Sequence, residues 1–91
     1  SNDGILIPVM AIDVERGALI GPPTLESRGY SGSDHILQQA TEALADALRD
    51  LKPSELRDVD GVKHVAANTV RIYVNRKAKL RPLVVPLIVE V

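Results

Sequence analysis

The C-terminal stretch Leu83-Val84-Val85-Pro86-Leu87-Ile88-Val89-Glu90-Val91 decides how the rest of this chain must fold. It is apolar and rich in β-branched residues, and it is much shorter than the roughly 20 residues of a membrane-spanning helix, so it predicts a buried β-strand. Successive side chains of a strand point to opposite faces, which places the odd-numbered residues in one apolar row and Val84, Pro86 and Ile88 in another. A sheet that is apolar on both faces needs to be covered on both.

Residues 5–14 form a second stretch of this kind, apolar in both alternating rows until Asp13. Pro8 has no N–H to donate, so we expect it at a sheet edge or with its missing donor turned outward. Pro86 gives the same indication for the last strand. The two prolines therefore suggest that the first and last strands are edges around a central second strand.

A turn, Glu15-Arg16-Gly17-Ala18, follows the first strand. Its glycine can adopt positive φ, which predicts a β-hairpin. The second strand of the hairpin covers residues 19–21, is interrupted by Pro22-Pro23 and resumes at residues 24–27. We expect a bulged or bent strand there.

Two helices are predicted between these strands and the C-terminal one. The first begins at a cap on Ser33 or Asp34 and runs to about Leu51, with apolar residues spaced by three and four. The second covers about residues 60–79. Residues 69–75 alternate as a strand would, but the length of the segment without an internal glycine or proline after Gly61 favours a helix.

The predicted fold is α+β in the order β-β-α-α-β, a single domain of residues 4–91 with two helices packed on one face of a three-stranded sheet. Residues 1–3 are assigned to a tag remnant or linker. Because the helices cover one face only, we expect the other face to be an interface. Its candidates are Leu6, Met10 and Ile12, or the side chains that alternate with them, together with Val84 and Ile88. A monomer that leaves its sheet exposed is the alternative.

The composition limits the classes of protein that this chain can belong to. It has no cysteine, so it needs neither disulfides nor thiolate metal sites, and a reducing cytoplasm suits it. No apolar stretch is long enough for a membrane helix, so no membrane partner is expected. The net charge is −1, but residues 61–89 hold six basic residues and no acidic one. This asymmetry indicates either an anionic partner or a solvated basic helix end.

The chain carries no recognisable catalytic pattern. His35 and His64 lack the spacing of metal ligands, and no serine lies in a G-x-S-x-G motif. We therefore expect no catalytic residue, no metal site and no bound cofactor within the chain. Residues 29–32 match the G-x-x-G motif of RNA-binding KH domains, but that motif joins two helices, whereas here it follows a strand.

An RNA-binding module is the alternative function. Basic residues gather towards the end of the second helix, and each could contact a phosphate independently of RNA sequence: Arg71, Arg76, Lys77, Lys79 and Arg81. The only aromatic residues are Tyr30 and Tyr73, so a platform for stacking bases is not expected.

Two motifs at the ends of the chain resemble one known family. They are Gly17-Ala-Leu-Ile-Gly21-Pro22-Pro-Thr-Leu-Glu-Ser27-Arg28-Gly29-Tyr30 and Arg81-Pro82-Leu-Val-Val-Pro86-Leu-Ile-Val-Glu90-Val91. With the two helices between them, they resemble the C-terminal domain of bacterial ribonuclease J over residues 4–91. The resemblance also supports a helix for residues 62–79. Pro23 beside Pro22 and the valine-rich second helix depart from the family pattern.

The resemblance implies that the parent protein is a cytoplasmic, metal-dependent ribonuclease, with 5′ to 3′ exonuclease and endonuclease activity in RNA decay and maturation. Its zinc and catalytic residues would lie in metallo-β-lactamase and β-CASP domains, whose motifs are absent from this sequence, so none is carried over. This chain would then be no enzyme by itself. It would be an assembly module that supports oligomerisation and activity, with a second copy or its own catalytic domains as partner and RNA reached through the parent enzyme.

Overall fold

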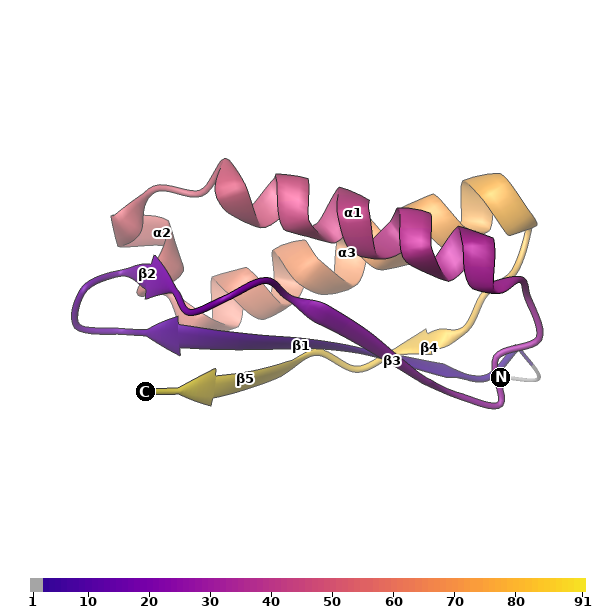
Figure 1. The fold of residues 1–91 in the computed structure, drawn as a ribbon, viewed down its shortest axis with the longest axis horizontal. Helices are drawn as coiled ribbons and strands as arrows, with labels where there is room; N and C mark the ends of the chain where they lie inside the picture. The colour runs from indigo at the N-terminus through magenta and orange to yellow at the C-terminus, as the bar shows by residue number, and fades with distance from the viewer. Residues whose placement is uncertain (1–2) are drawn as a thin grey trace.

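The computed structural model describes residues 3–91, which form five strands and three helices (Figure 1). Their order is β1 (Ile5–Asp13), β2 (Ala18–Leu19), β3 (Thr24–Arg28), α1 (Asp34–Arg49), α2 (Pro53–Leu56), α3 (Val59–Ala78), β4 (Leu83–Val84) and β5 (Leu87–Glu90). The α+β class is confirmed. Ser1 and Asn2, part of the predicted tag remnant or linker, lie outside the described residues.

The sheet has five strands where three were predicted, because two of the predicted strands are each split around a proline. β2 and β3 pair antiparallel with β1, whereas β4 and β5 pair parallel with it. Ile5 pairs with both Arg28 of β3 and Leu83 of β4, so these two strands lie on opposite sides of β1. β1 is therefore the central strand, and the suggestion that it is an edge beside a central second strand was wrong.

Pro8 is tolerated in the central strand because its backbone nitrogen faces β4 and β5 at a point where neither strand pairs with β1. The carbonyls of Gly4, Leu6 and Ile12 accept hydrogen bonds from N–H groups of the C-terminal residues. Even-numbered residues of β1 therefore direct their backbone groups towards β4 and β5. Pro8 belongs to this set and lies opposite the break between β4 and β5, where the ladder is interrupted.

The two long helices begin at side-chain caps. The Ser33 hydroxyl accepts a hydrogen bond of 3.1 Å from the N–H of Ile36 at the start of α1, so Ser33 is the cap among the two that were predicted. The Asp58 carboxylate accepts one of 3.1 Å from the N–H of Gly61 in α3. α3 is continuous from Val59 to Ala78, so the helix predicted at residues 60–79 is confirmed in spite of its strand-like half.

The turn predicted between the two helices contains the additional short helix α2. Pro53 lies in its first turn, where a missing N–H does no harm, and the Glu55 carboxylate accepts a hydrogen bond from the N–H of Lys52. The predicted order β-β-α-α-β is therefore corrected to β-β-β-α-α-α-β-β.

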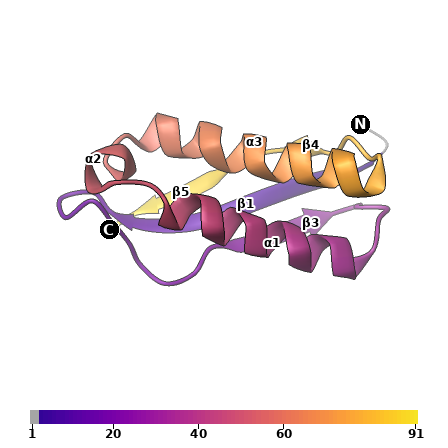
Figure 2. The same cartoon turned by 90° about the horizontal axis from the view of Figure 1, so that it is seen from above.

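α1 and α3 lie side by side over one face of the sheet (Figure 2). The buried hydrophobic side chains of the core lie between these two layers, and no described polar residue is buried with them. They are Leu6, Met10, Ile12, Ala40, Leu44, Leu48, Leu56, Val62, Ala66, Val70 and Val74. No described helix covers the opposite face of the sheet (Figure 1).

Candidate interaction surfaces

The side chains of β1 alternate between the covered and the uncovered face. Leu6, Met10 and Ile12 point towards the helices and are at most 1% exposed. They belong to the core, so their assignment to the uncovered face was wrong. The alternating set, which the sequence left open, lies on that face instead and comprises Ile5, Ile7, Val9 and Ala11.

Val84 and Ile88 also point towards the helices, where they are half-buried and pack against the core. Their assignment to the uncovered face was therefore wrong as well. The predicted alternation of the C-terminal stretch is confirmed, but the odd-numbered row is the outward one. Its members are 46–70% exposed: Leu83, Val85, Leu87, Val89 and Val91.

These outward rows form one continuous surface, which we name the outer sheet face. Parallel pairing places Ile5 beside Leu83, and Val9 beside Leu87. Ile20 joins this surface because its N–H donates to the Ala11 carbonyl, which continues the register of β2. The outer sheet face thus comprises Ile5, Ile7, Val9, Ala11, Ile20, Leu83, Val85, Leu87, Val89 and Val91.

A polar row on β3 borders the outer sheet face. Its side chains, those of Thr24, Glu26 and Arg28, are exposed. They pair with Val9, Ile7 and Ile5, respectively. Side chains of directly paired residues share a face of the sheet, so the surface is apolar over β1, β4 and β5 and charged along β3. Such an arrangement is typical of an interface with an apolar centre and a polar rim.

The opposite edge of the sheet is blocked at its middle. The N–H groups of Val85 and Val91 donate hydrogen bonds to carbonyls of β1. Backbone groups alternate in direction along a strand, so those of the even-numbered residues in the C-terminal stretch point to the free edge. Pro86 belongs to that even set and has no N–H to offer. A proline on an edge strand is one way in which proteins prevent sheets from joining edge to edge.

The predicted basic cluster lies on the other side of the molecule, on α3 and the loop after it. Its members are all exposed, and the structure brings Arg71, Arg76 and Arg81 together around one hollow of about 430 Å³. Lys77 lines a neighbouring hollow, with its ammonium group 5.9 Å from the centre of the Tyr73 ring. Lys79 instead ends α3 with φ of 57°, in the left-handed region that closes helices.

Several contacts hold the walls of these hollows in place. The Arg71 guanidinium donates a hydrogen bond to the Asn68 side-chain oxygen. The Tyr73 hydroxyl donates one of 3.0 Å to the side-chain oxygen of Gln39 on α1, which ties the two long helices together. The backbone N–H of Arg81 donates to the Asp3 carboxylate at 2.7 Å, which fixes the loop after α3 beside the start of β1.

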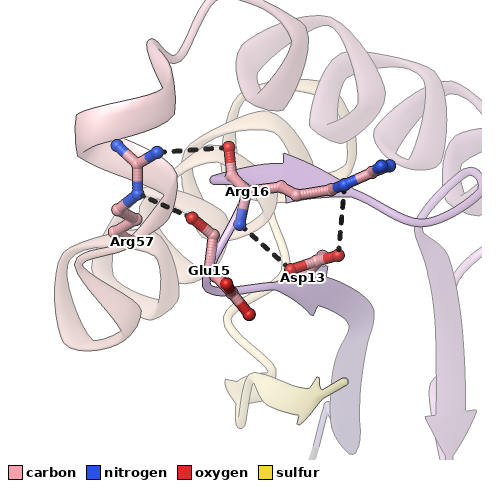
Figure 3. A network of polar contacts seen from close by, with 4 residues as sticks. All are labelled: Asp13, Glu15, Arg16 and Arg57. Atoms are coloured by element: carbon pink, nitrogen blue, oxygen red, sulfur yellow. Dashed lines mark hydrogen bonds and ion pairs between the residues drawn. The ribbon is translucent and has the colours of Figure 1, made fainter.

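A second polar network lies at the β1–β2 turn and is structural (Figure 3). The Arg57 guanidinium donates hydrogen bonds of 3.3 Å to the backbone carbonyls of Glu15 and Arg16. The Asp13 carboxylate accepts a 3.0 Å hydrogen bond from the Arg16 N–H. These bonds fasten α2 and the turn to each other, and the donors and acceptors are used within the fold.

The described residues contain no group of three or more histidine and acidic side chains that could hold a metal ion. His35 and His64 are both exposed on helices. Among residues 3–91, no helix has the length and apolar character required to cross a membrane. Two surfaces are candidates for binding, the outer sheet face and the basic cluster.

The sequence held a signal that could have identified the outward row of β1. Asp13 belongs to the same alternating set as Ile5 and Ala11, and it is partly exposed. A carboxylate at the end of a row favours the solvated side, so Asp13 indicates which of two apolar rows lies outside. The sequence predicted Ile20 in the second strand, at residues 19–21, but the interface candidates all lay on the first and last strands.

Comparison with known proteins identifies relatives of this chain. The family model described as "Ribonuclease J C-terminal domain" matches residues 1–91. The chain is 27% identical to Ribonuclease J2 of Bacillus subtilis (strain 168) over 94 residues, which cover 100% of this chain and 17% of that protein. It is 21% identical to Ribonuclease J 1 of Streptococcus pyogenes serotype M3 over 91 residues, which cover 97% of this chain and 16% of that protein. The chain thus spans about a sixth of the length of these curated relatives.

Proposed function

We propose that this chain, which belongs to the family of ribonuclease J C-terminal domains, is an assembly module that joins copies of its parent enzyme through the outer sheet face. The relatives are named ribonucleases, and we infer that the parent protein acts in RNA decay and maturation as an exonuclease and endonuclease. The hydrolytic chemistry and its zinc would belong to domains outside this chain. The contribution of this chain is to hold those domains together.

The distribution of exposed apolar side chains carries this proposal. Among residues 3–91, eight large apolar side chains are exposed, and all except Ile72 belong to the outer sheet face. Together the seven expose on the order of 600 Å², at the upper end of the largest patch on a typical monomer. A stable interface buries about 800 Å² on each partner, so this face with its polar border has the size that one requires.

A second copy of the chain is the occupant that best fits this face. A two-fold interface brings the same patch of both partners together, so the patch must complement itself. An apolar surface does so, and the polar border supplies one carboxylate and one guanidinium, on Glu26 and Arg28, which can pair with the opposite group of a second copy. Packing of sheet against sheet is a common way of burying such faces.

The free edge of the sheet favours packing by the face over joining by the edge. Pro86 lies in the middle of that edge and cannot donate a hydrogen bond to an added strand. Apolar burial would therefore supply most of the free energy of association, with few backbone hydrogen bonds.

The molar mass in solution tests this proposal. Size exclusion with light scattering is expected to give twice the 9.8 kDa mass of one chain at micromolar concentrations. Val89→Glu should give the single-chain mass, because a two-fold interface would bury two unpaired carboxylates. Ile72→Glu is the matched control, since Ile72 and Val89 are both 49% exposed but Ile72 lies on α3. A wild-type chain that stays monomeric at every concentration, or two variants with the same mass, would contradict the proposal.

A further inference from the structure

The exposed surface of the second half of α3 combines strong positive charge with concave shape. Residues 61–89 carry six basic side chains and no acidic one, although the whole chain has a net charge of −1. Arg71 and Asn75 are four residues apart on the helix, as are Ile72 and Arg76, so each pair shares a face. The loop after Lys79 adds Arg81 to the same side, and the four polar side chains line a single hollow together with Ile72.

A second hollow lies beside the first one and reaches α1. It is lined by Ala43 of α1 and by Asn68, Thr69, Ile72, Tyr73, Arg76 and Lys77 of α3. Ile72 and Arg76 line both hollows, so Arg76 lies where the two meet. We name these two adjacent hollows the trough: Arg76 borders both, Arg71 and Arg81 line the first, and Lys77 lines the second.

We propose that this trough binds the phosphate backbone of RNA. Guanidinium groups present planar pairs of N–H donors that match the oxygens of a phosphate, and several positive groups along one helix suit a linear polyanion. The Tyr73 ring is held by its hydrogen bond to Gln39 and lies under the Lys77 ammonium, and it is the only aromatic side chain among the described residues that line the two hollows. Binding is therefore expected to follow charge and salt and not base sequence. The choice of RNA rests on the proposed function, in which the chain serves an enzyme of RNA decay.

The trough and the outer sheet face do not compete for space. α3 lies in the helix layer, and the outer sheet face is on the opposite side of the sheet (Figures 1 and 2). A dimer formed through the sheets would leave both troughs open. RNA binding and assembly can therefore be measured separately on the same variants.

Fluorescence anisotropy with a labelled single-stranded oligouridylate tests the proposal on the 91-residue chain. Affinity should fall steeply between about 50 and about 200 mM salt, and Arg76→Ala should weaken binding at low salt by about fivefold to tenfold. Arg71→Ala should act in the same direction, and each substitution should lower the slope of log affinity against log salt by about 0.7. Arg76→Lys should recover part of the loss because the charge is kept. Arg49→Ala is the matched control, since Arg49 is an exposed arginine at the far end of α1.

The outcomes separate this proposal from the proposal on assembly. Val89→Glu should dissociate the chains and retain RNA binding at the trough, whereas Arg76→Ala should retain the dimer mass and lose RNA affinity. Equal RNA binding by Arg76→Ala, Arg71→Ala and Arg49→Ala, or no salt-dependent binding by the wild-type chain, would overturn the RNA site. Polyglutamate that binds the wild-type chain more tightly than oligouridylate does would overturn it in favour of an acidic protein partner. Circular dichroism of each variant establishes that it is folded.

Discussion

The inner and the outer face of β1 are built from the same kinds of side chain and have different surroundings. Leu6, Met10 and Ile12 on the inner face are at most 1% exposed beneath α1 and α3, whereas Ile5 on the outer face is 37% exposed. Hydrophobicity alone therefore does not decide which face of this strand is the core. The difference comes from the helices, which are joined to the sheet so that both lie over the even-numbered row (Figure 1).

The largest expected effect is on the stability of the inner face. Leu6→Ala should lower the free energy of unfolding by about 2–5 kcal/mol, because it leaves a cavity among fully buried side chains. Leu83→Ala is the matched outer substitution, since Leu83 is 54% exposed beside Ile5, and it should cost less than about 1 kcal/mol. Urea unfolding at a concentration where the chains are dissociated measures both. Equal losses would show that the two faces are equally buried.

The next effect concerns the contact between the β1–β2 turn and α2. Gly17 has φ of 65°, and a Cβ atom there would lie 2.5 Å from the Pro53 carbonyl oxygen of α2. Gly17→Ala should therefore lower stability by about 2–3 kcal/mol, from backbone strain together with this clash. Gly21→Ala is the control, because Gly21 has φ of 72° with no described heavy atom within 4 Å of the added Cβ.

The control substitution should cost only the strain of the left-handed backbone, about 1 kcal/mol. Thermal unfolding of the two variants gives the difference that is due to contact with α2. If both variants lose the same stability, the β1–β2 turn does not press against α2 in solution, and the helix layer is held over the inner face by the core alone.

How much of this arrangement the sequence predicts depends on whether the signal is local. The start of β1 at Ile5, a cap at Ser33 or Asp34 and the alternation of the C-terminal stretch follow from nearby residues. The structure confirms the start and the alternation, ends β1 one residue before the predicted Val14, and uses Ser33 as the cap. The position of β1 in the sheet could not be predicted in this way. Pro8 indicates an edge by local rules, and it is accommodated centrally only because a break in a strand about 80 residues later lies opposite it.

The basic cluster and the outer sheet face also differ in how much of each the sequence predicts. The order of residues in the sequence predicts the positive charge near the end of α3, but the meeting of Arg71, Arg76 and Arg81 depends on how the loop after Lys79 turns back beside the helix. For the sheet, both rows of β1 are apolar, so periodicity leaves the outward row undecided and only Asp13 indicates it. Sequence periodicity thus predicts helices and strands well, whereas a surface that combines distant segments of the chain can be identified only from the tertiary structure.

A smaller effect tests the polar network at the β1–β2 turn. Arg57→Ala removes two hydrogen bonds, to the carbonyls of Glu15 and Arg16, and should lower stability by about 0.5–1 kcal/mol because both bonds are long and exposed. Arg49→Ala removes a single exposed ion pair with Asp46 and should cost about 0.3 kcal/mol. Urea unfolding of the two variants compares them. A larger loss from Arg49→Ala would show that the network contributes little to fastening α2.

The smallest effect concerns Tyr30, which packs at the end of the helix layer against the core. Its hydroxyl oxygen is buried, and no described residue forms a hydrogen bond with it. Tyr30→Phe should therefore leave stability unchanged or raise it by up to about 1 kcal/mol, because a buried polar group without a partner is removed. Burial raises the pKa of Tyr30 above its usual value of 10.0, and the nearby Asp34 carboxylate raises it further.

The raised pKa of Tyr30 predicts how the stability of the folded chain depends on pH in the alkaline range. Above pH 10 the unfolded chain would lose the Tyr30 proton while the folded chain keeps it, so the wild-type protein should lose stability as the pH rises through this range. Tyr30→Phe should remove that part of the loss. Urea unfolding of both proteins at neutral pH and above pH 10 gives the difference, and a stability gap that does not change with pH would mean that the Tyr30 hydroxyl is solvated in the folded chain.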